Sequence, residues 1–102
     1  MNEQELHAKI GEAWKAHYAG QHETAVQMFQ QILVNAPDHV DANWGLALSY
    51  RKVGDRDRAL SVFEKVRELV QTRLTTDSED RARFVMLARM VAQQIEQMSA
   101  FI

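Results

Sequence analysis

Apolar residues along this chain recur every three to four positions, which is the period of an amphipathic α-helix. In the first such segment, at about residues 3–19, the apolar positions are Leu6, Ile10, Ala13, Trp14 and Tyr18. Similar segments follow at about residues 22–35, 39–53 and 56–74, and a last one runs from about 78 to 98. The pattern therefore predicts five helices and no strand.

Glycine and proline separate the first four segments. Gly20 and Gly54 follow the first and third segments, where glycine can adopt the left-handed conformation that ends a helix. The only proline, Pro37, ends the second segment. Each glycine therefore predicts a sharp turn between two helices, so that the chain folds into helical hairpins.

Aspartate and serine stand where the later helices should begin. Their side chains can accept hydrogen bonds from the free amides of a first helical turn. We expect Asp38 to cap the third helix and Asp55 the fourth. For the last helix we expect a cap at Asp77 or Ser78, with acidic residues 79 and 80 in its first turn.

The chain also repeats itself. Six small or aromatic residues recur 34 residues further on. These pairs are Ala8 and Ala42, Gly11 and Gly45, Ala13 and Ala47, Gly20 and Gly54, Ala25 and Ala59, and Phe29 and Phe63. Because each unit of a repeat protein buries its apolar face on its neighbour, the repeat predicts a stack of helical hairpins.

These residues resemble the tetratricopeptide repeat, a helix–turn–helix unit of the same length. The matching positions are Ala13, Gly20, Ala25, Phe29 and Pro37 in the first unit and Leu46, Ala47, Tyr50, Gly54, Asp55, Ala59 and Phe63 in the second. The resemblance implies an all-α, right-handed solenoid that forms a single domain over residues 1–102. Its repeats would span about residues 6–39 and 40–73, and a capping helix about 78–98.

The repeated small residues have a packing role in this architecture. The alanines at positions 13, 25, 47 and 59 should let the two helices of each hairpin approach closely, and Phe29 and Phe63 should fill the space between hairpins. For Gly11 and Gly45 we expect close packing of neighbouring hairpins. A second interpretation is that Gly45 leaves room for a ligand side chain between Trp14 and Trp44.

The resemblance also implies that the first helix of each unit lines a concave face. We expect a partner-binding groove there, made of Ile10, Trp14, His17, Tyr18, Trp44, Leu48, Arg51, Lys52 and Arg89. Aromatic residues and arginine are frequent anchors of interfaces, and the cations would attract an acidic or amphipathic segment. In the alternative interpretation, Trp14 and Trp44 complete a small core.

The function predicted is that of a non-enzymatic adaptor, scaffold or assembly factor that binds a peptide or protein segment. One alternative is homo-oligomerisation, for example as a homodimer, through the groove and the last helix. A weak nucleic-acid binder using Arg81, Arg83 and Arg89 is the third. A net charge of −2 argues against bulk nucleic-acid binding, which favours a basic chain.

The composition and motifs of the chain limit the metal sites, catalytic sites and membrane segments that can be expected. The chain has no cysteine, and His7, His17, His22 and His39 lack metal-ligand spacing, so we expect no metal site and histidines at the surface or in the groove. No catalytic or cofactor motif is present. The chain has neither a membrane-length apolar run nor a signal-like N-terminus, so a cytoplasmic location is expected.

Overall fold

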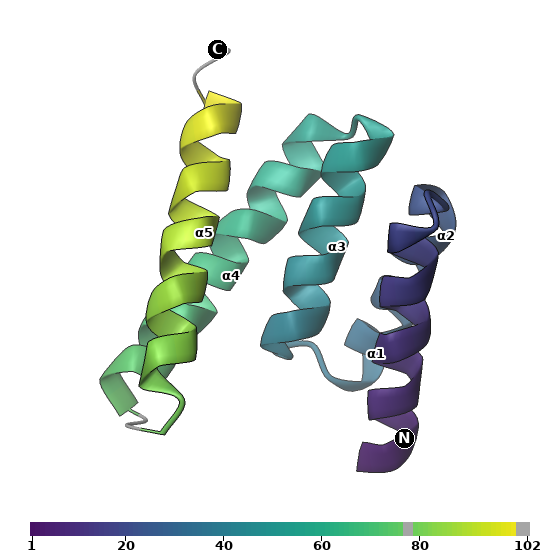
Figure 1. The fold of residues 1–102 in the computed structure, drawn as a ribbon, viewed down its shortest axis with the longest axis horizontal. Coiled ribbons are helices and arrows are strands. Elements are labelled where there is room, and N and C mark those ends of the chain that lie inside the picture. The colour runs from purple at the N-terminus through teal and green to yellow at the C-terminus, as the bar shows by residue number, and fades with distance from the viewer. Residues whose placement is uncertain (77–78, 100–102) are drawn as a thin grey trace.

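The computed structural model describes residues 1–76 and 79–99, and within them it contains five α-helices and no strand. The helices are α1 (Glu3–Tyr18), α2 (His22–Asn35), α3 (Val40–Val53), α4 (Arg56–Thr76) and α5 (Arg81–Ser99). Helices α1, α3 and α5 lie in one layer, with α2 and α4 behind them (Figure 1). The predicted all-α hairpin array is confirmed.

Glycine turns join the helices of each hairpin, as predicted. Gly20 and Gly54 have φ angles of +83° and +86°, in the left-handed region that favours glycine. The four alanines expected between the helices of the hairpins are completely buried, at positions 13 and 25 in the first hairpin and 47 and 59 in the second. Because alanine has the smallest side chain after glycine, the two backbones of each hairpin can pack closely.

Phe29 fills the space between the two hairpins. A Cβ atom placed on Gly45 of α3 would lie 2.2 Å from Cζ of Phe29, so the glycine is needed to admit this ring. Phe29 itself is completely buried. The close-packing interpretation of Gly45 is therefore confirmed. The idea that this glycine leaves room for a ligand side chain is wrong, because the phenyl ring occupies that room.

Gly11 occupies the equivalent place in α1 but has a different environment. Apart from the adjoining backbone of its own helix, no atom lies within 4 Å of a Cβ built there, so close packing is the wrong explanation for this glycine. Positions 43, 46 and 49 of α3 are buried, whereas their repeat equivalents in α1 are Lys9, Glu12 and Lys15, all exposed. A polar outer face of this kind is typical of a terminal repeat.

The helix caps agree with the predictions in part. Asp55 caps α4, because its Oδ1 accepts a hydrogen bond from the amide of Arg58 at 3.2 Å. The cap of α3 is His39, not Asp38: the imidazole Nδ1 accepts from the Ala42 amide at 3.1 Å. Asp38 was a wrong prediction because its carboxylate turns outward, 3.7 Å from the Lys65 ammonium.

The last helix starts later than predicted. The expected caps, Asp77 and Ser78, lie outside the described residues. Residues 79 and 80 precede α5 in a turn and do not form its first turn. Asp80 has a φ angle of 56°, and this left-handed backbone interrupts the helical path before Arg81.

Helix α5 packs against α4 along a stripe of residues spaced by seven: Phe84, Val91 and Met98 are all buried. Two arginines, one in the last turn of α3 and one at the start of α4, contact its C-terminal half. Arg56 donates to the main-chain oxygen of Met98, and Arg51 donates to the side chain of Gln94. Helix α5 therefore covers the apolar side of α4 and is held at its end by polar contacts.

Candidate functional site

Five of the predicted groove residues make up a partly exposed set on the neighbouring helices α1 and α3. We call this the front surface, and it consists of Trp14, Tyr18, Leu48, Arg51 and Lys52. Leu48 and Trp14 are half-buried, whereas the other three are exposed. The front surface thus combines apolar, aromatic and cationic side chains.

Two stacked aromatic rings form one part of this surface. The centroids of Trp14 and Tyr18 lie 5.6 Å apart, with an angle of 22° between the ring planes. The indole Nε1 of Trp14 donates to Oδ2 of Asp41 at 3.0 Å, which links α1 to α3. The edge of the indole also contacts Phe29, at a centroid distance of 5.3 Å. Tyr18 is 79% exposed and rests on this fixed indole.

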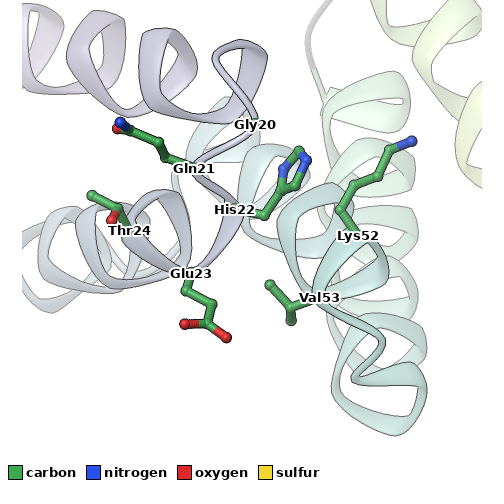
Figure 2. Close-up of a pocket in the computed structure, with 7 residues that line it drawn as sticks. All are labelled: Gly20, Gln21, His22, Glu23, Thr24, Lys52 and Val53. Carbon is green, nitrogen blue, oxygen red and sulfur yellow. The ribbon is translucent and has the colours of Figure 1, made fainter.

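Lys52 borders a pocket beside the aromatic pair. The pocket has a volume of about 500 Å³ and is lined by residues 20–24 of the α1–α2 turn and by Lys52 and Val53 of α3 (Figure 2). Figure 2 shows the side chains of His22 and Lys52 extending to one side, whereas the Glu23 carboxylate points to the other. Among the described residues, the Lys52 ammonium makes no ion pair. This end of the front surface is therefore cationic.

Three predicted groove residues lie in the interior. Ile10 and Trp44 are buried, and the Trp44 ring packs edge-on against Phe63 with centroids 5.6 Å apart. Trp44 is thus a core residue, as the alternative interpretation held, while Trp14 serves both core and surface. The third is His17, which is 8% exposed.

Arg89 is separated from the α5 residues that contact α3. It lines a shallow pocket of about 450 Å³ with Arg81, Ala82, Val85 and Met86, all from α5. The α5 side chains that reach Arg51 are those of Gln94 and Gln97. The polar end of α5 beside the front surface is therefore formed by amides, which the sequence interpretation did not identify.

His17 and His39 were expected at the surface or in the groove, but both have structural contacts. His17 Nδ1 lies 3.0 Å from Oγ of Ser49, which is completely buried, and 3.4 Å from Nδ1 of His22. Its position could have been found in the sequence, because His17 follows Ile10 and Ala13 at the seven- and four-residue spacing of one helical stripe.

Both imidazoles are more acidic than an ordinary histidine. Burial lowers the pKa of His17, and positive charge on His22 and Lys52 lowers it further. Burial also lowers the pKa of His39; Arg83 and Arg73 act in the same direction, whereas Asp41 opposes them.

Metal-binding clusters and membrane-spanning helices are both absent from the described parts of the chain. Residues 1–76 and 79–99 contain no group of three or more His, Cys, Asp or Glu side chains that could hold a metal ion. None of the helices in these ranges has the length and apolar content needed to cross a membrane.

A second pocket, on the opposite layer, lies between α2 and α4. It has a volume of about 360 Å³, and its lining includes Leu33, Val34, Tyr50 and Val62. Val34 is exposed, but no lysine borders this pocket and its one arginine, Arg58, is 3.6 Å from the Asp55 carboxylate. This surface therefore lacks the unpaired cation of the front surface.

Comparison with known proteins gave one match. A family model described as tetratricopeptide repeat matches residues 16–75, which is more than half of the chain. The matched range includes α2, α3 and nearly all of α4. No curated protein and no solved structure matches the chain.

Proposed function

Because the chain belongs to the tetratricopeptide repeat family, whose repeats generally mediate protein–protein interactions, we propose that it binds a segment of a partner protein on its front surface. The family is typically a non-enzymatic interaction module. The role proposed is accordingly that of an adaptor, scaffold or assembly factor, with the partner held across α1 and α3, the first helices of the two hairpins.

The observation that carries this proposal is the exposed ring of Tyr18. Its side chain leaves 79% of its surface in water, so most of the ring is free for a partner to cover. Tyr18 stacks on Trp14, and Trp14 is fixed by its hydrogen bond to Asp41. A ring held in place in this way loses little conformational freedom when a partner covers it, which favours binding.

The charge of the front surface indicates the chemistry of the partner. Lys52 is exposed without an ion pair among the described residues, and Arg51 is exposed beside it. Leu48 and the aromatic pair add apolar surface. We therefore propose an acidic amphipathic segment, with apolar side chains on Trp14 and Tyr18 and a carboxylate near Lys52.

Peptide binding tests the proposal directly. Fluorescent acidic amphipathic peptides would be titrated with the full chain, alongside peptides of the same apolar residues with lysine in place of each acid. We expect the acidic peptides to bind more tightly than the lysine peptides. Their binding should weaken as salt is added, since exposed charges are screened within about 10 Å at 0.1 M. A pull-down from the native source, followed by mass spectrometry, would then supply natural partner segments.

Two variants and one matched control locate the site. Tyr18→Ala and Lys52→Glu should each lower the affinity for the acidic peptides by about tenfold, equivalent to about 1.4 kcal/mol of binding free energy. Val34→Ala removes an equally exposed apolar side chain from the opposite layer and should have no effect. If Tyr18→Ala and Lys52→Glu bind as the parent does while Val34→Ala loses affinity, the front surface is not the site.

Self-association is a second candidate, supported by the outer side of α5. Met86 and Met90 are exposed there, and the buried stripe of α5 packs against α4. Exposed methionines are adaptable contacts at interfaces. Sedimentation analysis should show a dimer that Met86→Glu dissociates if this candidate is correct; a monomer at all concentrations excludes it.

A further inference from the structure

Two histidine side chains make contacts with α3, one as the cap at its start and one from α1 in its second half. At its start, His39 Nδ1 accepts a hydrogen bond from the amide of Ala42 at 3.1 Å. In its second half, Ser49 Oγ contacts Nδ1 of His17 from α1 at 3.0 Å. Because α3 contacts α1, α2 and α4, the protonation states of these two imidazoles bear on how the hairpins are joined.

The contact at His39 requires an unprotonated ring nitrogen. A nitrogen that carries a proton donates and cannot accept, so protonation removes the cap of α3. Ala42 is completely buried, and its amide would then lose this acceptor. A cation at a helix start is also opposed by the helix dipole.

The charged groups around His39 are of both signs, and its burial disfavours a cation. Arg73 of α4 and Arg83 of α5 line the same pocket as His39, together with Asp41 and Asp80. The carboxylate of Asp41 is the group that raises the pKa of His39, but it also accepts the hydrogen bond of Trp14. Protonation of His39 would add a charge to a partly buried site that already holds two arginines beside the two aspartates.

His17 is poorly placed to carry charge for a different reason. Its ring is 8% exposed and is surrounded by Tyr18 of α1, His22 of α2 and Ser49 of α3. The Nδ1 atoms of His17 and His22 lie 3.4 Å apart, so protons on both would oppose each other. The nearby charged group on α3 is the Lys52 ammonium, and the Glu23 carboxylate of α2 points away from it (Figure 2).

We propose that His17 and His39 form an acid-sensitive attachment of α3. At neutral pH both imidazoles are uncharged and hold α3 at its start and against the first hairpin. On acidification both become cations, the α3 cap is lost, and the first hairpin loosens from the second. This inference does not rest on the proposed partner, although α3 provides part of the front surface, so any binding there would weaken in parallel.

The direction of the two pKa shifts gives the pH range. Both pKa values lie below the ordinary 6.5 of histidine, because burial penalises the charged form. A group with a lowered pKa in the folded state contributes its stability fully above 6.5, and this stability is lost as the pH falls through the lowered value. The unfolding equilibrium should rise by about tenfold for each pKa unit of lowering.

The test is urea unfolding of the full chain, without any partner, between about pH 8 and pH 5, above the range in which most carboxylates titrate. The parent should lose stability below the ordinary histidine pKa. In the variant His17→Gln with His39→Asn, the new side chains can form hydrogen bonds but do not titrate, and asparagine is a good helix cap. This variant should lose much less stability over the same range. The control His7→Gln replaces an exposed histidine of α1 and should behave as the parent.

A second measurement keeps the proposal testable if the double variant does not fold. Proton NMR of the parent should give His17 and His39 titration midpoints below that of histidine in a short unstructured peptide. The protection of the Ala42 amide against hydrogen exchange, taken relative to the intrinsic exchange rate at each pH, should fall in the same range. The proposal is overturned if the two midpoints match that of the peptide, if the parent is equally stable at both ends of the range, or if the double variant declines as steeply as the parent.

Discussion

Replacing Gly45 with alanine should destabilise the protein, although alanine is the better helix former. A Cβ atom at this position would lie 2.2 Å from Cζ of Phe29 and 2.6 and 2.7 Å from its Cε atoms. Carbon atoms in favourable contact are about 3.5–4.0 Å apart. The ring must therefore move by more than about 1 Å. It is completely buried and has the indole of Trp14 against it, so little room is available.

The expected magnitude follows from two opposing terms. Overpacking of a filled core typically costs about 1–3 kcal/mol. The higher helix propensity of alanine offsets up to about 1 kcal/mol of this overpacking cost. Because the overlap involves three ring atoms, we expect a net loss of about 1–2 kcal/mol. In a domain of this size each kcal/mol lowers the melting temperature by about 4–8 °C.

The repeat provides a matched control for this substitution. Gly11 has the equivalent place in α1, is exposed, and would have no atom within 4 Å of a Cβ added to it. Gly11→Ala should therefore raise the free energy of unfolding by up to about 1 kcal/mol, so the two variants should change stability in opposite directions. Urea unfolding followed by circular dichroism measures both. If Gly45→Ala stabilises as much as Gly11→Ala does, Phe29 does not occupy the space assigned to it.

Three further predictions concern the hairpins and the last helix. Ala59→Leu should overpack the second hairpin and lower the unfolding free energy by about 1–3 kcal/mol; an unchanged melting curve would contradict the packing. Arg56→Ala should speed hydrogen exchange in the last turn of α5, where Arg56 donates to Met98, while amides in the middle of α5 keep the parental rate. Deleting the residues after Thr76 should uncover Phe63 and Val70, both completely buried, and produce an aggregating or molten species by light scattering and dye binding. A soluble, cooperatively unfolding fragment would show that α5 is not needed as a cap.

Residue order alone was enough to predict most of the fold. Three signals act within one helix or one hairpin: the helical period, the two left-handed glycines and the repeated alanines. They can therefore be recognised in a short stretch of sequence. The caps were less predictable. Asp55 was identified correctly, but at α3 the side chain of His39 takes the cap and Asp38 faces Lys65 instead. Several polar residues near a helix start compete for the same amide, and the sequence does not decide between them.

The candidate site depended more on tertiary packing. Trp14 and Trp44 were equally plausible groove residues in the sequence, yet Trp44 packs on Phe63 in the interior while Trp14 supports the exposed ring of Tyr18. The contacts of His17 with Ser49 and His22 join three helices, and the helical spacing that places His17 on a buried stripe does not identify these two partners.

Gly11 and Gly45 show why the tertiary structure had to decide these points. They are the same residue at the same place in the repeat, and both lie in the middle of a helix. Gly45 admits a phenyl ring, whereas a Cβ on Gly11 would meet no atom within 4 Å. The difference arises because burial is set by the neighbouring helix, and α3 has α2 packed on the side that α1 exposes to water.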